Sequence, residues 1–381
     1  MADIAAKAGV HVTTVSLALR GHPRIPDATR KRIRKLADRL GYRPDAMLQA
    51  LVAHRERVFV RRNIPTLAYV TNWMSRFGWK DALAHLEFYL GAQGKAAELG
   101  FKIEHFSLKD AGMTPSRLGQ MLFARGIRGI ILASHAMEMG DSLQLEWDHF
   151  SAVKIDYFPR EPGINIISNN QRDAVRAAVQ NAVRLGYRRI GFVMHGGWDR
   201  AAENIWTAGF LCEQQYIYRS DRIPVHLFAG VPPLRPQADD GSPSTADPLA
   251  FKRWYKAHRP EVIISRASFV LPHLEAMGVR VPQDVAFIDV FREPGDAGTA
   301  GIIQKHRAVG ETAVEILSGQ LQRNQFGVPA IQTSTYIDGE WIEGESCPRR
   351  QPTSGHIWDP GWDVAAGQKG RPPARLRGGR P

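Results

Sequence analysis

Near the N-terminus, apolar side chains recur every three or four positions in three successive stretches, which is the spacing of helical faces. The first stretch, residues 3–8, ends at Gly9, where the chain can reverse, and the third runs from Pro26 to Gly41. The three apolar faces consist of Ile4, Ala5 and Ala8, of Val12, Val15 and Leu19, and of Ile33, Leu36, Ala37 and Leu40. Helices this short are marginal alone, so the pattern predicts a helix-turn-helix unit held together by the third helix.

From Pro65 to about residue 340, apolar strands alternate with amphipathic helices. The predicted strands include TLAYVTN (66–72), FKIEHFS (101–107), GIRGIILAS (126–134), YRRIGFVMH (187–195), VIISR (262–266) and DVAFIDV (284–290). The predicted helices include FYLGAQGKAAELG (88–100), PSRLGQMLFAR (115–125), RDAVRAAVQNAVRLG (172–186), AAENIWTAGFLCEQQ (201–215) and VLPHLEAMG (270–278). This alternation predicts parallel sheets covered by helices, and the segment is long enough for two lobes.

Length and composition favour a globular protein with several domains. The chain has 381 residues, of which 44% are hydrophobic. No apolar run reaches the length of a membrane helix and no secretory signal is visible, so we expect a cytoplasmic chain without a membrane partner. Cys212 and Cys347 are the two cysteines, and they lie in no CxxC or Cys/His cluster. We therefore expect no disulfide framework, metal site or cofactor.

The positive charge is concentrated at the two ends of the chain. The formal net charge is +12, with +9 in residues 1–62, +5 in residues 348–381 and −2 in between. A basic head on a near-neutral body is typical of a nucleic-acid-binding module, although a solvated surface is the alternative. Residues 345–381 are rich in Pro, Gly and Arg without periodicity, so we expect a disordered, dispensable tail that could also bind DNA nonspecifically.

The N-terminal unit is more specific in its residues than in its periodicity. The runs DIAAKAGVHVTTVSLALRG (3–21) and TRKRIRKLADRLGYRPD (29–45) resemble the headpiece of the LacI/GalR family of bacterial repressors, which favours DNA binding over a generic three-helix bundle. The resemblance places Val12, Thr13 and Leu17 at positions that read base edges, and Thr14 and Ser16 near phosphates. Leu17 stands where many members carry an arginine, so we expect an atypical operator that is read through methyl groups and shape.

The resemblance also implies a hinge helix that orders on operator DNA and inserts a leucine into the minor groove. Residues 44–63 place Leu48, Leu51 and Val52 on one face, and Leu51 falls at the wedge position by residue count. A plain amphipathic linker helix is the alternative. The predicted DNA-binding residues are Val12, Thr13, Thr14, Ser16, Leu17, Arg20 and Leu51.

The body resembles the effector-binding region of the same family, which has the two-lobed fold of periplasmic sugar-binding proteins. The strongest matches are GIRGIILAS, RLGYRRIGFV and MGVRVPQDVAFID. Ligands of open α/β sheets bind at the carboxyl ends of the strands, and residues at these ends are the effector candidates. The predicted effector-binding residues are Asn72, Trp73, Ser134, Asp156, Asn169, Trp198, Asn204, Arg266 and Phe291.

Indole faces and strand-end polar groups suit a sugar or another ring. We expect Trp79 and Trp206 to offer such faces beside Trp73 and Trp198, although for any one Trp a core position is the favoured alternative. Asp156 is the best single candidate. The pattern departs from sugar-binding members at three positions. Asn204 replaces an Arg, Arg266 an Asn or Asp, and Phe291 an Asp, so an ordinary hexose is not expected and the effector class stays open.

Motifs for catalysis are absent from the sequence. HGGW at 195–198 is not accompanied by a G-x-S-x-G nucleophile elbow, and neither a Walker loop nor H-E-x-x-H occurs. We therefore do not expect an enzyme.

The interpretation is an α/β protein with an all-α headpiece followed by a two-lobed, periplasmic-binding-protein-like domain with parallel sheets. The expected boundaries are a headpiece at 1–43, a hinge at 44–63, a two-lobed effector and dimerisation domain at 64–344, and the tail at 345–381. We expect the protein to be a homodimeric transcriptional regulator that acts as a repressor. Its expected partners are double-stranded operator DNA and a small-molecule effector such as a carbohydrate. A solute-binding protein or enzyme with the same body, and a DNA-binding protein that has lost its effector, are the alternatives.

Overall fold

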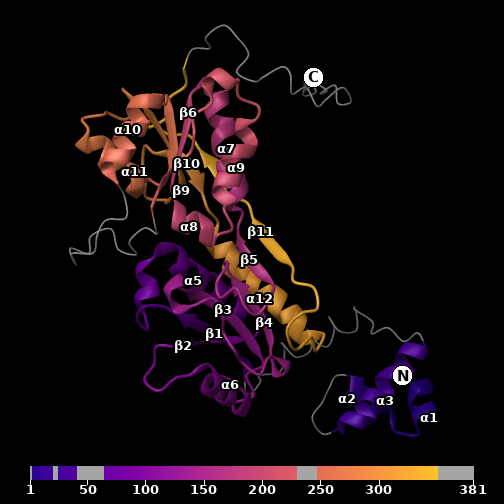
Figure 1. Cartoon of the computed structure of the whole chain (residues 1–381). Helices are drawn as coiled ribbons and strands as arrows, with labels where there is room; N and C mark the ends of the chain where they lie inside the picture. The colour runs from indigo at the N-terminus through magenta and orange to yellow at the C-terminus, as the bar shows by residue number, and fades with distance from the viewer. Residues whose placement is uncertain (1, 20–24, 41–63, 230–246, 351–381) are drawn as a thin grey trace, which may run out of the picture. The chain divides into compact units, whose positions relative to one another are not determined.

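The computed structural model describes residues 2–19, 25–40, 64–229 and 247–350 (Figure 1). Three predicted features lie outside these residues: Arg20, the hinge at 44–63 with Leu51, and the tail from residue 351 onward. The chain divides into two compact units, residues 1–169 with 305–337 (unit 1) and residues 170–304 with 338–381 (unit 2). Among the described helices, none is both long and apolar enough to span a membrane.

The N-terminal three-helix unit has a small core of its own. Its helices are α1 (Ala2–Ala8), α2 (Val12–Leu19) and α3 (Asp27–Arg39). The buried residues are Ile4, Ala5, Val15, Ala18, Ile33 and Ala37. Two residues expected on the apolar faces are on the surface instead, because Val12 is the first residue of α2 and Leu40 lies beyond the end of α3; they are 39% and 37% exposed.

Unit 1 contains a parallel six-stranded sheet with the order β11-β5-β4-β3-β1-β2. Its strands are β1 (Thr66–Asn72), β2 (Lys102–Ser107), β3 (Gly129–His135), β4 (Ser151–Ile155), β5 (Ile166–Asn169) and β11 (Ser334–Ile337). Successive residues of β1 point to opposite faces of the sheet. Leu67 and Tyr69 belong to the hydrophobic core on one face, and Ala68 and Val70 belong to the core on the other, so both faces are buried.

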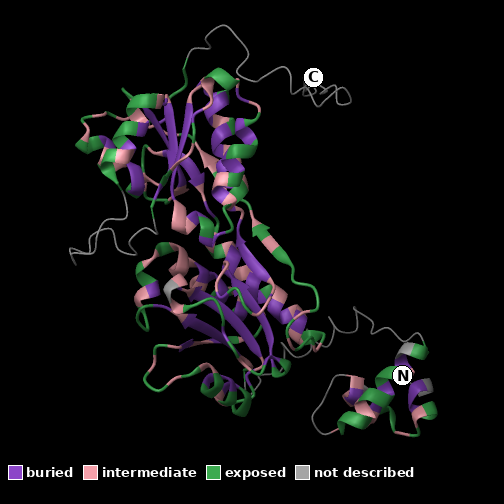
Figure 2. Cartoon of the chain, in the orientation of Figure 1, coloured by how far each residue is buried: buried purple, intermediate pink, exposed green. Residues whose placement is uncertain are grey.

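Three longer helices cover the two faces of this sheet (Figures 1 and 2). Helices α5 (Leu83–Glu98) and α12 (His306–Gln322) pack on the Leu67 face, and α6 (Pro115–Ala124) packs on the Ala68 face. The short helices of the unit are η1 (Gly78–Asp81), η2 (Met137–Met139) and η3 (Trp147–His149).

Unit 2 repeats this architecture with the strand order β12-β10-β9-β8-β6-β7, in which β12 alone is antiparallel to its neighbour. Its strands are β6 (Ile190–His195), β7 (His226–Phe228), β8 (Val262–Ser265), β9 (Ala286–Arg292), β10 (Ala300–Ile303) and β12 (Glu340–Ile342). Its helices are α7 (Gln171–Arg184), α8 (Gly196–Ala201), α9 (Ile205–Gln214), η4 (Arg219–Asp221), α10 (Pro248–His258) and α11 (Ala267–Ala276). Helices α7 and α9 lie on one face and α10 and α11 on the other (Figure 1). The predicted fold class is confirmed.

Residues 346–350, assigned above to the tail, are instead bonded to unit 2; we call them the C-terminal strap. Ser346 accepts the backbone N–H of Phe287 at 2.8 Å, and the Tyr187 hydroxyl donates to the Pro348 carbonyl at 2.7 Å. The Arg350 guanidinium lies 4.5 Å from the Tyr187 ring centroid. The described fold therefore continues through Arg350.

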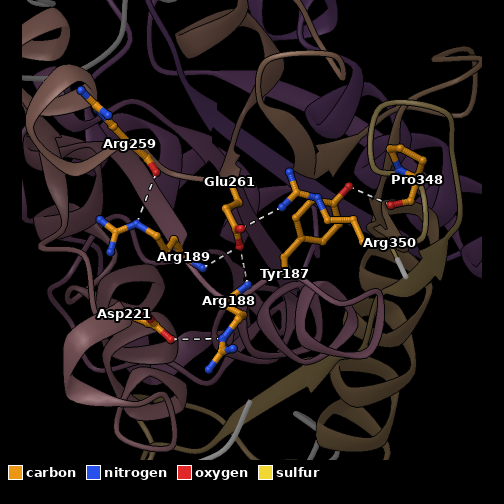
Figure 3. A network of polar contacts seen from close by, with 8 residues as sticks. All are labelled: Tyr187, Arg188, Arg189, Asp221, Arg259, Glu261, Pro348 and Arg350. Carbon is orange, nitrogen blue, oxygen red and sulfur yellow. Dashed lines mark hydrogen bonds and ion pairs between the residues drawn. The ribbon is translucent and has the colours of Figure 1, made fainter. Parts of the chain in front are cut away.

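Glu261 joins the strap to the sheet, as Figure 3 shows. One of its carboxylate oxygens accepts the backbone N–H groups of Arg188 and Arg189 at 2.7 and 3.1 Å, just before β6. The other forms an ion pair with Arg350 at 2.8 Å. Glu261 directly precedes β8, so its carboxylate connects the start of β8 with the start of β6 and with the last described residue of the chain.

Candidate functional site

The outer surface of α2 carries the headpiece residues predicted to contact DNA. Val12 and Thr13 are exposed, and Thr14 and Leu17 are half-buried. Nδ1 of His11 accepts the backbone N–H of Thr13 at 3.3 Å and lies 2.8 Å from its hydroxyl. Because that ring nitrogen is the acceptor, the Thr13 side chain is oriented before any DNA binds. The side chain of Ser16 is not among those described.

Helix α3 carries exposed basic side chains. Arg34, Lys35 and Arg39 are exposed, whereas Arg32 donates to the Ala8 carbonyl at 3.1 Å and so binds the C-terminus of α1. Arg30 is paired with Asp27. The exposed cations of α3 are therefore available for phosphates, while two others stabilise the three-helix unit.

In unit 1, four predicted effector residues lie at the carboxyl ends of four neighbouring strands. Asn72 and Asn169 are the last residues of β1 and β5, Ser134 lies near the end of β3, and Asp156 directly follows β4. Ser134 is the extra residue of a β-bulge opposite β1, and both Ser134 and Asp156 have left-handed backbones, with φ of 51° and 66°. The strand order brings these positions to one edge of the sheet, here called the unit 1 edge.

Two histidines that the sequence analysis missed belong to this edge. Nδ1 of His85 lies 3.0 Å from the Ser134 hydroxyl, and the Asn169 amide donates to Nδ1 of His306 at 2.9 Å. Burial, and the charge of His306, lower the pKa of His85 to about 4, so its imidazole is neutral at physiological pH. A solitary histidine at the start of a helix gives no sequence signal for such a role.

The acid of the unit 1 edge is Asp156. Burial raises its pKa to about 6, and the hydroxyl of Ser168, which donates to it at 2.7 Å, opposes that rise. The side-chain oxygen of Asn169 is buried and has no hydrogen-bond partner among the described residues. The edge thus offers a carboxyl group, an amide oxygen and the neutral imidazole of His85, which suit a ligand with hydroxyl or N–H groups.

The tryptophans do not all serve as ligand faces. Trp79 and Trp206 are 0% and 3% exposed, so the expectation that they offer faces is wrong: both are core residues, with their N–H groups bonded to Arg76 and Gln171. Trp73 lies at the unit 1 edge, 4.7 Å from His85 between ring centroids. Its exposure is only 9%, so it offers a ligand little more than its rim.

In unit 2, Trp198, Arg266 and Phe291 gather at the carboxyl ends of the adjacent strands β6, β8 and β9, here called the unit 2 edge. All three side chains are half-buried. The Trp198 and Phe291 rings are stacked, with centroids 5.1 Å apart and planes at 21°. Asn204, also predicted for this site, is an exposed residue with a left-handed backbone that begins α9, and no contact joins it to these three side chains among the described residues.

Comparison with known proteins relates the headpiece to one family. The model of the bacterial regulatory proteins of the lacI family matches residues 1–45, which include all three headpiece helices. The N-terminal unit of this chain is therefore similar to the corresponding part of the LacI-family regulators.

Relatives of this chain are named as transcriptional regulators, which agrees with the expectation that it is not an enzyme. The regulator MalR of Streptomyces coelicolor is 31% identical over 204 residues, 51% of this chain and 53% of MalR. The chain thus spans about half the length of the curated relatives it matches first. The repressor CytR of Escherichia coli is 22% identical over 86% of this chain and 91% of its own length.

Solved structures share the fold of this chain. The complex of the transcriptional regulator CelR with cellobiose has a TM-score of 0.51 at 19% identity, covering 90% of this chain and 98% of its own. The Lac repressor dimer bound to operator and an anti-inducer has a TM-score of 0.52 at 16% identity, with coverages of 91% and 98%. At such identities the likeness shows the fold alone.

The unit 2 edge contains a carboxyl group whose titration can be measured. Asp289 accepts the backbone N–H groups of Phe291 at 2.7 Å and Ala267 at 3.0 Å. Burial raises its pKa from 3.8 to about 6 despite these bonds. The folded state therefore retains the proton to a higher pH than the unfolded state. The resulting stabilisation is complete below pH 3.8 and is lost as the pH rises through 6.

We expect Asp289→Asn to remove this pH dependence. Relative to the variant, the wild-type protein should lose up to about 3 kcal/mol of unfolding free energy between pH 4 and pH 8. Urea unfolding of both proteins at matched pH values measures the difference, and other titrating groups cancel between them. A difference that is constant across this range would contradict the buried, raised pKa of Asp289.

Proposed function

We propose that this protein is a sequence-specific DNA-binding transcriptional regulator whose operator affinity changes when a small molecule binds to the edges of its two α/β units. The observation that carries the proposal is the LacI-family headpiece with an outward-facing α2. In this proposal the protein is a cytoplasmic homodimer that represses transcription. Each of its two headpieces reads half of a pseudo-palindromic operator.

The headpiece supports DNA binding through its shape and its charge. The core residues of α2 face α1 and α3, which leaves Val12 and Thr13 exposed for base edges. The exposed cations of α3 and the basic residues up to 62 provide the sequence-independent attraction to phosphates. Leu51 in the hinge remains the proposed minor-groove wedge.

The two edges support control by an effector. Each unit has polar or aromatic side chains at the carboxyl ends of parallel strands, where ligands of such sheets bind. A ligand that binds one conformation of the protein better than another would shift the equilibrium between them, and this shift would be coupled to operator binding. Among the structural relatives, CelR is in complex with cellobiose, so a carbohydrate or carbohydrate derivative is the proposed class.

Selection of bound duplexes from a random DNA library tests the regulator proposal. Purified full-length protein is used at two salt concentrations. An enriched palindrome with a flexible central pyrimidine–purine step is expected, because that step is easily kinked. Salt-sensitive binding without any enriched sequence would contradict the proposal and leave DNA binding to charge alone.

We expect Thr13→Ala to weaken binding to the selected operator by about 1–3 kcal/mol, the usual value of one base contact. Binding to a scrambled duplex should change little, because phosphate contacts provide it. Fluorescence anisotropy with both duplexes measures the ratio of specific to nonspecific affinity. Thr333→Ala, at an exposed threonine of unit 1 outside the headpiece, is the matched control. An unchanged ratio in the Thr13 variant would remove Thr13 from the base-reading set.

A further inference from the structure

Arg266 holds a half-buried cation between aromatic rings at the unit 2 edge. It directly follows β8 and precedes α11, and its guanidinium carbon lies 5.8 Å from the Phe269 ring centroid and 5.7 Å from that of Phe291. Trp198 in turn lies 5.6 Å from Phe269 at 74° and is stacked on Phe291. The rings of Phe269 and Phe291 restrict where the guanidinium can go, so little ordering entropy would be lost when it binds a ligand.

Within the described ranges of the chain, the guanidinium of Arg266 makes no hydrogen bond or ion pair. Asp289 attracts it only through space, since the charge of Arg266 is a lesser cause that opposes the rise in the pKa of Asp289. Other partly buried arginines of unit 2 do have partners: Arg176 bonds to Glu213 at 2.7 Å, and Arg188 pairs with Asp221 at 3.3 Å. A guanidinium offers five N–H donors, so a half-buried one without partners is costly unless a ligand supplies acceptors.

The nearby carboxyl group of Asp289 attracts this cation but is not bonded to it. Its two oxygens accept backbone N–H groups, one from Phe291 and one from Ala267. These bonds fix the backbone at Phe291 and the residue after Arg266, so Asp289 is a positioning residue for the cation and for one ring. The arrangement leaves a positive group beside flat apolar surface, at the sheet edge where ligands bind.

We infer that the effector is an anionic ring compound, whose carboxylate or phosphate pairs with Arg266 and whose ring packs against Trp198 and Phe291. This inference rests on the proposed function, since it names the class of molecule for the proposed effector site. The planar guanidinium matches the geometry of a carboxylate or phosphate, which can accept two parallel N–H bonds. A neutral sugar could accept hydrogen bonds from Arg266 but would leave its charge unpaired.

The test compares full-length wild-type protein with Arg266→Gln, with Arg253→Gln as a matched control. Arg253 is a 73% exposed arginine of α10 whose carboxylate contact is 3.9 Å long. The probes are inorganic phosphate, glucose 6-phosphate, glucuronate and glucose, each titrated at constant ionic strength against sodium chloride. Thermal unfolding reports binding, because a ligand that binds the folded state raises the melting temperature. Circular dichroism without a probe establishes that each variant is folded.

The expected result is a saturable, stabilising response to at least one anionic probe in the wild type and in Arg253→Gln, with glucose much weaker. Arg266→Gln should weaken that response about 10- to 100-fold in apparent dissociation constant, as loss of a charged hydrogen-bonded pair does. Glucuronate and glucose 6-phosphate separate a carboxylate from a phosphate ligand. Phosphate salts also raise the melting temperature without binding, because they are excluded from the protein surface. The response of Arg266→Gln measures this nonspecific contribution.

Three outcomes would overturn the inference: glucose as effective as its anionic derivatives, an equal response in Arg266→Gln, or no anion response in the wild type beyond that of Arg266→Gln. Failure of the proposed function looks different. It would appear in the DNA selection with wild-type protein as the absence of an enriched sequence, whatever the anions do. An enriched operator without an anion response would reject the effector class alone.

Discussion

Gly310→Ala is expected to destabilise unit 1 by about 3 kcal/mol or more, because α5 and α12 pack with their backbones in contact. A Cβ at Gly310 would lie 2.0 Å from the Phe88 carbonyl oxygen of α5, and one at Gly91 would lie 2.0 Å from the Arg307 carbonyl oxygen of α12. These are backbone atoms and cannot rotate aside. The helices would have to separate, which would open the core formed by the buried residues of both helices and of the sheet.

Helix α5, which contains Gly91, also provides a matched control. Gly94 is exposed on α5, and a Cβ there meets nothing within 4 Å. Gly94→Ala should therefore stabilise by about 0.5–1 kcal/mol, the usual gain when a helical glycine becomes alanine. Urea unfolding of Gly310→Ala, Gly91→Ala and Gly94→Ala measures both signs. Equal stability of Gly310→Ala and wild type would show that the two helices do not pack this closely.

The alternating elements could be predicted from the sequence because both faces of each sheet are buried. Continuous apolar runs such as residues 129–133 then indicate strands directly, and helix periodicity fills the intervals. The assignment of elements to units could not be predicted in this way. Helix α12 follows β10 of unit 2 in the chain but packs in unit 1, and β11 pairs with β5 although their residues are 168 apart.

The candidate site was predictable only where strand ends determine it. Asn72, Ser134, Asp156 and Asn169 follow from one rule about parallel sheets, and the structure brings them to one edge. His85 and His306 reach that edge from helices, and no local pattern marks them. Trp79 and Trp206 show the opposite error, because an indole near a strand end has the same sequence signature whether it faces a ligand or the core.

Arg266 illustrates how a departure from the family pattern gains meaning from the structure. In the sequence, Arg266 follows VIIS at a position where sugar-binding members carry Asn or Asp, which only weakens the resemblance to those members. In the structure its guanidinium is flanked by Phe269 and Phe291 and forms no ion pair with any residue that the structure describes. The partners of a side chain depend on elements distant in the chain, so its charge balance could not be derived from the sequence alone.

Truncation after Glu345 is expected to lower the unfolding free energy of unit 2 by about 3 kcal/mol or more, whereas truncation after Arg350 should change it by no more than about 0.5 kcal/mol. Both proteins lack the basic tail from residue 351 onward, but only the shorter one lacks the C-terminal strap. Thermal unfolding and resistance to proteolysis are compared between the two proteins. Their difference gives the contribution of residues 346–350 to the stability of unit 2.

The expected loss has several physical sources. Ser346 bonds to β9 and β10, donating to the Phe287 carbonyl at 2.8 Å and accepting the Ala300 N–H at 2.8 Å. Cys347 is 3% exposed, so its removal opens a cavity beside Tyr187, whose hydroxyl also loses the Pro348 carbonyl. The ion pair between Arg350 and Glu261 contributes less, because both side chains are partly solvated. If both truncated proteins matched the full-length chain, the strap would be a surface contact without energetic weight. If both were equally destabilised, the stabilisation would come from the tail instead.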